Sequence, residues 1–246
     1  MDKGATAARA LSLLDLTNLN DDCSENDIDD LCARAVTAVG NVAAVCVWPR
    51  FVGQCRDRLS GTDINVAAVA NFPEGALDTA KAVSETEAIV SDGGSEVDVV
   101  LPYGAWLVGE REAARGLVSA CKAACGTKAH LKVILETGKL IDPSSIAEAS
   151  QDAIEAGADF IKTSTGKVDI SATPEAAESM LGIIKKMGKP VGFKASGGIR
   201  TTEDAALYLA LADRIMGPDW TSPKTFRFGA SGLLDDLLIN LPDAET

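Results

Sequence analysis

Short apolar, β-branched runs alternate with longer, alanine-rich amphipathic stretches from about residue 41 to residue 230. These runs predict eight β-strands, at 41–49, 64–72, 96–102, 130–136, 159–165, 190–196, 213–217 and 226–230. Strands that alternate with helices form βαβ units around a parallel sheet. Eight such units in a chain of 246 residues favour a closed (β/α)8 TIM barrel, built as a single domain over residues 1–246.

Residues that begin and end helices support this alternation. The stretch 173–188 opens with Thr-Pro and closes with glycine, as many helices do. Residues 24–40 begin with Ser24, a favourable N-cap, and predict an extra N-terminal helix that covers the barrel floor. The polar segment 15–21 in front of it is interpreted as a cap for that helix.

The charge and the cysteine pattern argue against several classes of partner. Asp and Glu outnumber Lys and Arg by 36 to 23, and a net charge of −13 disfavours nucleic acid and anionic membranes. The six cysteines form no CxxC pair, the N-terminal segment lacks a signal-peptide pattern, and no apolar run reaches the ~20 residues of a membrane span. A cytoplasmic location is therefore expected. The single histidine, with no cysteine cluster, argues against a metal site.

Polar side chains interrupt three of the predicted strands. Asp98 lies in EVDVV, Lys162 in DFIKTST and Lys194 in VGFKASGG, while Cys46 lies in the first strand. A buried charge is costly unless it is paired, so each of these residues needs a reason. Because active sites of such barrels form at the carboxyl ends of the strands, we expect the three charged side chains to converge on one cavity.

Two lysines and a carboxylate suit imine chemistry. An ordinary lysine, with a pKa near 10.4, is almost wholly protonated at neutral pH and is not a nucleophile. A second cation nearby, together with partial desolvation, disfavours the ammonium form and frees the amine. Asp98 can then move protons. This chemistry requires neither a metal nor an organic cofactor.

Glycine-containing stretches in two predicted loops suit a phosphate group. Ser196-Gly197-Gly198 follows the Lys194 strand, and 228–232 precedes an apolar segment that predicts a helix. Backbone N–H groups at a helix N-terminus bind anions. Lys167 in TSTGK adds a cation, although this motif lacks the spacing of a Walker A loop. Glu136 ends the fourth predicted strand and is expected to pair with one of the lysines.

The chain resembles the family of 2-deoxyribose-5-phosphate aldolases from about Leu11 to Leu234. FIKTSTGK and GFKASGGIR carry the resemblance most specifically. The remaining matching motifs, in order along the chain, are SLLDLTNLND, VCVWPRF, NFPEG, EVDVVLPYGA, LKVILETGKL and RFGASGLL.

The resemblance implies a class I, metal-independent lyase that reversibly cleaves 2-deoxy-D-ribose 5-phosphate to D-glyceraldehyde 3-phosphate and acetaldehyde, in deoxynucleotide catabolism. It implies that Lys162 forms the imine, Lys194 lowers the pKa of Lys162 and Asp98 assists proton transfer. A homodimer with no cofactor is also implied. The residues implied to bind the substrate are Asp15, Thr17, Cys46, Thr165, Gly166, Lys167, Gly197, Gly198, Gly229, Ser231 and Gly232.

Two positions depart from some family members. Ser231-Gly232 replaces a Ser-Ser pair, which predicts weaker but not lost phosphate binding through the remaining backbone N–H. The tail, NLPDAET, lacks a tyrosine that assists proton transfer in some members, so Asp98 and water would have to suffice. Cys46 is expected at the barrel mouth, where unsaturated aldehydes formed from acetaldehyde could alkylate it.

Three alternatives share parts of this pattern. A phosphosugar isomerase on the same fold would use a Glu or His base without the lysine pair. Another Schiff-base aldolase could act on a ketose phosphate, and pocket size would decide between the two substrates. A non-catalytic sugar-phosphate sensor would need the glycines but not the lysines.

Overall fold

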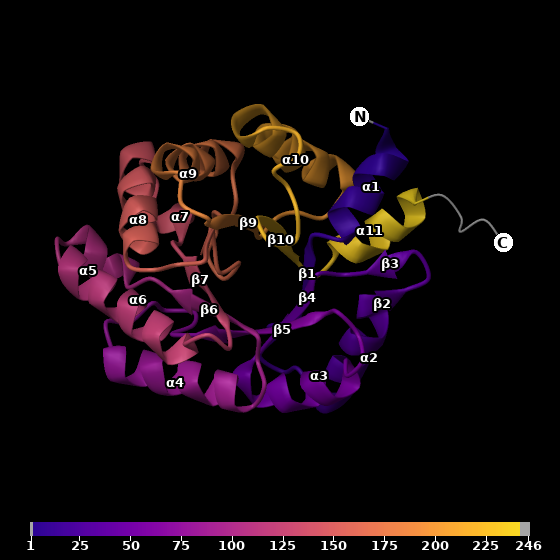
Figure 1. The fold of residues 1–246 in the computed structure, drawn as a ribbon, viewed down its shortest axis with the longest axis horizontal. Helices are drawn as coiled ribbons and strands as arrows, with labels where there is room; N and C mark the ends of the chain where they lie inside the picture. The colour runs from indigo at the N-terminus through magenta and orange to yellow at the C-terminus, as the bar shows by residue number, and fades with distance from the viewer. Residues whose placement is uncertain (1, 242–246) are drawn as a thin grey trace.

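The computed structural model describes residues 2–241 and places eight parallel strands in a closed barrel (Figure 1). Around the barrel the order of the strands is β1-β10-β9-β8-β7-β6-β5-β4. Their bounds are β1 Leu14–Thr17, β4 Ala44–Val47, β5 Asn65–Ala70, β6 Glu96–Val100, β7 His130–Ile134, β8 Phe160–Lys162, β9 Gly192–Ser196 and β10 Phe226–Ala230. The predicted (β/α)8 barrel is confirmed. The tyrosine-free end of the chain falls in residues 242–246, outside the described part.

Eight helices, one after each barrel strand, surround the strands (Figure 1). They are α2 Glu25–Ala35, α3 Val52–Arg58, α4 Thr79–Ser91, α6 Arg111–Cys125, α8 Pro143–Glu155, α9 Pro174–Met187, α10 Thr202–Met216 and α11 Leu233–Asn240. Short elements complete the connections: η1 Pro49–Phe51, α5 Tyr103–Leu107, α7 Thr137–Leu140 and an antiparallel pair, β2 Val36–Thr37 with β3 Gly40–Asn41. No helix within residues 2–241 combines the length and the apolar composition that a bilayer-spanning segment requires.

Local sequence explains where α9 begins and ends. The side chain of Thr173 accepts a hydrogen bond from the backbone N–H of Ala176, and Pro174 occupies the first turn, where its missing N–H costs nothing. Gly188 ends the helix with φ 62°, a left-handed conformation that suits glycine. The predicted Thr-Pro start and glycine stop are confirmed.

The predicted strand at 213–217 is wrong, and the eighth strand is β1. Residues 213–216 form the last turn of α10, which ends at Gly217. The buried residues of α10 include Ala205, Tyr208, Leu209 and Ala212, and this spacing of three and four residues is helical. The polar segment at 15–21 instead begins inside β1, whose Asp15 pairs with Ala44 on one side and with Gly229 on the other.

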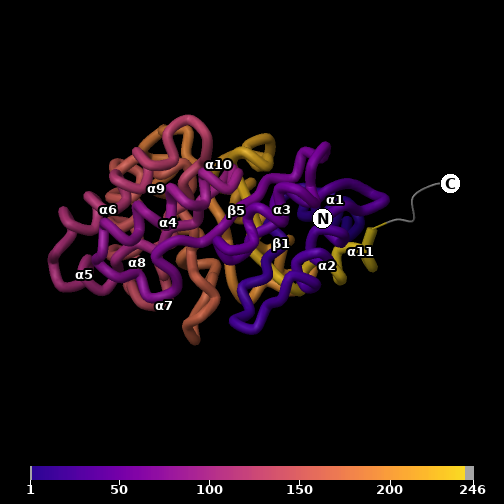
Figure 2. The backbone as a smooth tube through the Cα atoms, turned by 90° about the horizontal axis from the view of Figure 1, so that it is seen from below, coloured from indigo at the N-terminus to yellow at the C-terminus, as the bar shows by residue number. Residues whose placement is uncertain are grey.

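The helix predicted after Ser24 forms, but it does not cover the barrel floor. Ser24 and Asp27 make a complete capping box, which confirms the predicted N-cap. The helix, α2, belongs to the surrounding ring because it follows β1 and packs against α3 and β4. The additional helix is α1, Lys3–Leu11, which packs on α10 and lies beside α11 in both views (Figure 1 and Figure 2).

The apolar core lies between the strands and the helices, whereas the barrel interior is divided. Alternate residues of each strand point outward, and Phe193, Phe226 and Phe228 pack among them. Inside the barrel, β4 and β5 contribute Cys46 and a small apolar cluster around it. The inward positions of the other strands include seven buried charged residues, Asp15, Glu96, Asp98, Lys132, Lys162, Lys194 and Arg227. This half of the interior is the candidate site.

Candidate active site

Strand register brings the three predicted catalytic residues together. Lys162 of β8 lies opposite Lys194 of β9, and Asp98 of β6 projects into the same interior. Nζ of Lys162 donates to Oδ2 of Asp98 at 2.9 Å, and Nζ of Lys194 donates to the same oxygen at 2.8 Å. Lys194 also donates to Oδ2 of Asp15 at 2.5 Å. The expected convergence of these side chains is present in the structure.

A deeper group of charges supports this cluster. Lys132 of β7 donates to Oδ1 of Asp98 at 3.1 Å and also bonds Glu96. Arg227 of β10 donates from Nη1 to Oδ1 of Asp15 at 2.6 Å and from Nη2 to Oε1 of Glu96 at 2.8 Å. All of these side chains are at most 4% exposed, so water screens their interactions little.

The surrounding charges fix which groups stay ionised. Burial alone would raise the pKa of Asp98, but Lys132, Lys162 and Lys194 outweigh it and hold that pKa well below its usual range. Burial would lower the pKa of Lys194, yet Asp15 and Asp98 outweigh it and raise the pKa. Lys194 is therefore a permanent cation beside Lys162, which is the role that imine chemistry requires of it.

Lys162 differs from the other two buried lysines in its environment. Its ammonium group meets one carboxylate, Asp98, whereas Lys194 and Lys132 each contact at least two. Its side chain keeps 2% exposure, against 0% for the other two. Lys162 is thus the buried lysine with the fewest ion pairs to carboxylates.

The predicted phosphate glycines occupy loops at the carboxyl ends of β8 and β9. Gly166, Gly197 and Gly198 have φ of 80°, 87° and 81°, a region that favours glycine. A Cβ at Gly197 would lie 2.5 Å from Cβ of Ser171, so the loop before α9 packs directly on it. Any other residue at Gly197 would push these two loops apart.

The glycines near β10 have two different functions. Gly229 lies within the strand, where a Cβ would be 2.9 Å from Cε of Lys194. It therefore makes room for the stem of Lys194. Ser231 and Gly232 are exposed and precede α11, whose first turn has no side-chain cap. Its N–H groups are consequently available to an anion.

Lys167 reaches across the barrel mouth. Its Nζ donates to the carbonyl oxygen of Leu19 at 2.9 Å and lies 3.3 Å from Oδ1 of Asp21, both in the loop after β1. Its backbone N–H donates to Oγ1 of Thr165 at 3.0 Å. Lys167, the cation expected to bind the phosphate, therefore contacts the loop after β1 in this structure. Thr17, also expected at the sugar, is half-buried and donates to its own strand at the carbonyl of Asp15.

Two expectations at the site are wrong. Glu136 pairs with no lysine among the described residues; its carboxylate accepts from Oγ1 of Thr165 at 2.5 Å, because the left-handed backbone at Glu136 turns the chain toward β8. Burial raises the pKa of Glu136.

Cys46 is not exposed at the mouth, because its thiol points into the barrel and packs with Leu19, Ala67 and Val69. Burial raises the pKa of this thiol.

Three members of the buried cluster were absent from the sequence-based prediction: Glu96, Lys132 and Arg227. Lys132 and Arg227 interrupt predicted strands as Asp98 does, and Glu96 begins one. Glu96 also lies two residues before Asp98, which places both carboxylates on one face of β6. A systematic search for charges inside apolar strands would have found all three.

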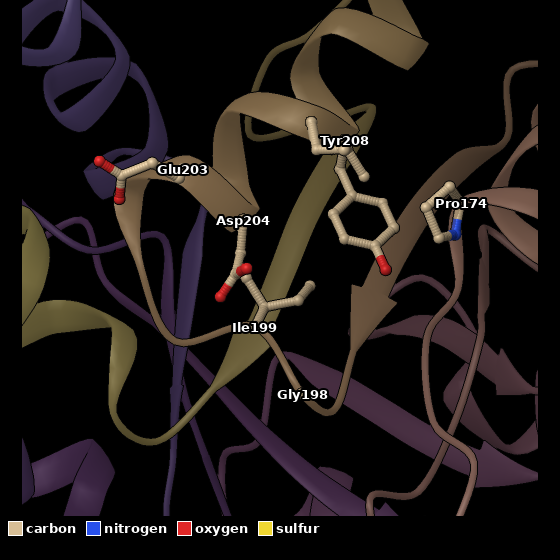
Figure 3. Close-up of a pocket in the computed structure, with 7 residues that line it drawn as sticks. Pro174, Gly198, Ile199, Glu203, Asp204 and Tyr208 are labelled. Carbon is tan, nitrogen blue, oxygen red and sulfur yellow. The ribbon is translucent and has the colours of Figure 1, made fainter.

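A separate cavity lies behind the β9 loop (Figure 3). It has a volume of 390 Å³ and is lined by Pro174, Gly198, Ile199, Glu203, Asp204, Leu207 and Tyr208. Burial raises the pKa of Tyr208 to about 12, so its hydroxyl stays protonated. None of the buried lysines lines this cavity, which touches the candidate site only through Gly198.

Comparisons with known proteins agree with this geometry. The chain is 54% identical to a deoxyribose-phosphate aldolase of Agrobacterium fabrum over 241 residues, 97% of this chain and 93% of that protein. A crystal structure of a putative deoxyribose-phosphate aldolase from Coccidioides immitis has 31% identity and a TM-score of 0.85, covering 95% of this chain and 86% of the other. An apo-form structure from Toxoplasma gondii, with the same putative assignment, has 25% identity and a TM-score of 0.90, covering 99% and 98%.

The sequence profile of one enzyme family matches nearly the whole barrel, from residue 9 to residue 234. The match includes every strand, the buried charges and the glycine loops. The chain therefore belongs to the DeoC/LacD family of aldolases.

Proposed function

We propose that this aldolase reversibly cleaves 2-deoxy-D-ribose 5-phosphate to D-glyceraldehyde 3-phosphate and acetaldehyde through an imine on Lys162. The observation that carries the proposal is the lysine pair: Lys162 and Lys194 share one oxygen of Asp98 in the buried interior of the barrel. The Agrobacterium fabrum relative is named for the same reaction.

The first step forms a carbon–nitrogen bond. The neutral amine of Lys162 attacks C1 of the open-chain sugar, and the resulting carbinolamine loses water to give a protonated imine. The permanent cation on Lys194 favours the neutral amine at the start of this step. Asp98, which stays ionised, lies within hydrogen-bond reach of both nitrogens and can move the protons of the step.

The second step breaks the bond between C2 and C3 of the sugar. The hydroxyl on C3 loses its proton, its oxygen becomes the aldehyde of D-glyceraldehyde 3-phosphate, and the electron pair of the broken bond moves into the imine. The enamine left on Lys162 gains a proton on C2 and is hydrolysed to acetaldehyde. Asp98, the carboxylate bonded to Lys162, is placed to accept the proton of the C3 hydroxyl and to return a proton to C2, directly or through water.

The phosphate would lie at the opposite end of the sugar. Gly166, Gly197 and Gly198 offer backbone N–H groups with little bulk, and Ser231-Gly232 begins α11. Lys167 would leave its contacts with the β1 loop to meet the phosphate. With glycine at 232, one hydroxyl donor is missing compared with some family members, and the backbone N–H would take its place.

Borohydride trapping tests the proposal. Reducing the protein in the presence of 2-deoxyribose 5-phosphate should fix the sugar, or the acetaldehyde derived from it, to the peptide containing Lys162. The adduct should disappear in Lys162→Ala. It should persist in Lys128→Ala, which removes an exposed lysine two residues before β7. A folded protein that neither consumes the sugar nor forms an adduct would rule the proposal out.

The carbonyl compound that forms the imine distinguishes this reaction from that of an aldolase for ketose phosphates. Acetaldehyde alone should be trapped on Lys162, whereas dihydroxyacetone phosphate should give no adduct. A phosphosugar isomerase would release no acetaldehyde from the sugar, and a sugar-phosphate sensor would bind the sugar unchanged. The products of a single incubation therefore separate the three alternatives.

The assembly and location belong to the same proposal. Family resemblance implies a homodimer in the cytoplasm, with each 246-residue chain forming one domain. Light scattering during size-exclusion chromatography should give twice the chain mass of 25.5 kDa. A mass of 25.5 kDa at micromolar concentration would contradict the dimer but leave the reaction untouched.

A further inference from the structure

Six of the seven buried charges form a closed ring in which every contact joins opposite charges. Four distances in this ring are 2.6 Å from Arg227 to Asp15, 2.5 Å from Asp15 to Lys194, 2.8 Å from Lys194 to Asp98 and 3.1 Å from Asp98 to Lys132. Lys132 contacts Glu96, and Glu96 returns to Arg227 at 2.8 Å. We call these six residues the charge ring. It contains three cations and three carboxylates, so it is neutral.

Lys162 is attached to this ring but is not a member of it. Its one ionic partner is Oδ2 of Asp98, which Lys194 already occupies. The other oxygen of Asp98 is occupied by Lys132. Each ring carboxylate is thus shared between two ring cations, and the ring itself has no excess negative charge to hold Lys162 as an ammonium ion.

The far side of the ring makes no ion pair with Lys162. Glu96 begins β6 two residues before Asp98, and Arg227, the second residue of β10, contacts it in the barrel interior. Both side chains are at most 4% exposed. Lys132 lies between Glu96 and Asp98 and is fully buried. Lys132 contacts Asp98, which is the partner of Lys162, and Arg227 contacts Asp15, which is a partner of Lys194. These residues can therefore influence Lys162 only through the two aspartates.

We infer that Glu96, Lys132 and Arg227 are positioning residues that keep the charge ring neutral, and that this neutrality is what leaves Lys162 free to react as an amine. The inference rests on the function proposed above, because it assigns a cause to the reactivity of the same lysine. The charged and titratable groups that face or influence Lys162 are Asp98, Lys194, Lys132, Asp15, Glu136 and Cys46.

Adding a negative or a positive charge to the ring should change the pKa of Lys162 in opposite directions. Lys132→Met leaves the ring with one excess negative charge, so Asp98 should hold Lys162 more firmly as an ammonium ion and raise its pKa. Glu96→Gln leaves one excess positive charge and should lower that pKa. The double variant Glu96→Gln/Lys132→Met restores neutrality and should bring the pKa back toward the original value.

The pKa of Lys162 can be measured without relying on catalysis. Protein labelled with ¹³C at lysine Cε would be titrated by NMR, with the Lys162 signal assigned from its absence in Lys162→Arg. The pH dependence of acetaldehyde trapping by cyanoborohydride would be recorded in parallel. Asp152→Asn, which removes a buried carboxylate of the helical layer, is the matched control and should shift neither curve. Arg227→Lys keeps the ring charge and should also leave the curves in place.

The inference is supported if the Lys162 titration shifts in opposite directions in Lys132→Met and Glu96→Gln and returns to its original position in the double variant. A merely structural role predicts lower stability or activity with the Lys162 titration unmoved, and that result would overturn it. Shifts in the same direction would overturn it as well. If the wild-type protein traps no acetaldehyde, the proposed function fails, while the NMR titration still decides whether the ring controls Lys162. Should one single variant fail to fold, the other is compared with the neutral double variant: a Lys162 titration that shifts in the single variant and returns in the double variant supports the inference, and an unmoved titration overturns it.

Discussion

Lys162 and Lys194 donate to one and the same carboxylate oxygen, Oδ2 of Asp98, at 2.9 and 2.8 Å. Two ammonium groups this close disfavour each other, so one of them gives up its proton more easily. Lys194 has a second carboxylate, Asp15, at 2.5 Å, and Lys162 has none. This geometry supports the proposed roles, with Lys194 as the cation and Lys162 as the nucleophile.

Removing the Lys194 charge should suppress activity near neutral pH. In Lys194→Met, Asp98 loses one of its two cationic neighbours at Oδ2 and should hold Lys162 as an ammonium ion. We expect kcat/KM at pH 7 to fall by about 100-fold, with partial recovery as the pH is raised. A pH–rate profile for 2-deoxyribose 5-phosphate cleavage measures this. Lys128→Met, at an exposed lysine, is the control and should behave like the wild type. A Lys194→Met profile with a lower maximal rate but an unchanged dependence on pH would contradict the prediction.

The contact of Lys167 with Asp21 should compete with phosphate binding. Asp21→Asn removes an exposed ion pair, a type worth about 0–1 kcal/mol, so KM for the phosphorylated sugar should fall by up to about five-fold. KM for unphosphorylated 2-deoxyribose should stay unchanged. Asp22→Asn makes the same change in net charge next to Asp21 and is the control. Equal effects of both variants would show that only overall charge matters.

Asp159 should contribute stability that depends on pH. Burial would raise its pKa, but His130, Lys122 and the N–H of Leu131 outweigh burial and lower the pKa to about 2, from an ordinary 3.8. Because the folded-state pKa is the lower one, the contribution is complete above pH 3.8 and disappears as the pH falls toward 2.

Urea unfolding from pH 7 to pH 3 measures this contribution. Asp159→Asn should unfold with a free energy about 1 kcal/mol lower at neutral pH, after allowance for partial solvent screening, and the difference should shrink below pH 4. Glu87→Gln, at an exposed position of α4, should show no such trend. A constant difference across the whole pH range would indicate lost packing instead.

Alkylation of Cys46 requires entry through the barrel mouth, since the thiol is fully buried. An unsaturated aldehyde should therefore label it slowly, and 2-deoxyribose 5-phosphate should protect it. Cys46→Ala should keep more activity than the wild type after incubation in concentrated acetaldehyde. Peptide mass mapping locates the adduct, and Cys121→Ala, at a buried thiol of α6, is the control. Equal inactivation of Cys46→Ala and wild type would end the hypothesis.

The sequence by itself determined the fold class and the chemistry. Alternating strand and helix patterns predicted the barrel, because each amphipathic period follows from the local geometry of its element. Asp98, Lys162 and Lys194 could be identified as candidates because a charge inside an apolar strand is costly wherever that strand is placed.

Only the tertiary structure decided which strands close the barrel and how the charges pair. Four residues such as Leu14–Thr17 are too few for a period to be recognised, and the run at 213–217 becomes a helical turn because it continues the buried face of α10. Pairing depends on register between strands far apart in sequence, which joins Asp15 to Lys194 across 179 residues and Arg227 to Glu96 across 131. The charge ring and the position of Lys162 outside it therefore exist only once the barrel has closed, because no local pattern specifies which oppositely charged side chains will meet.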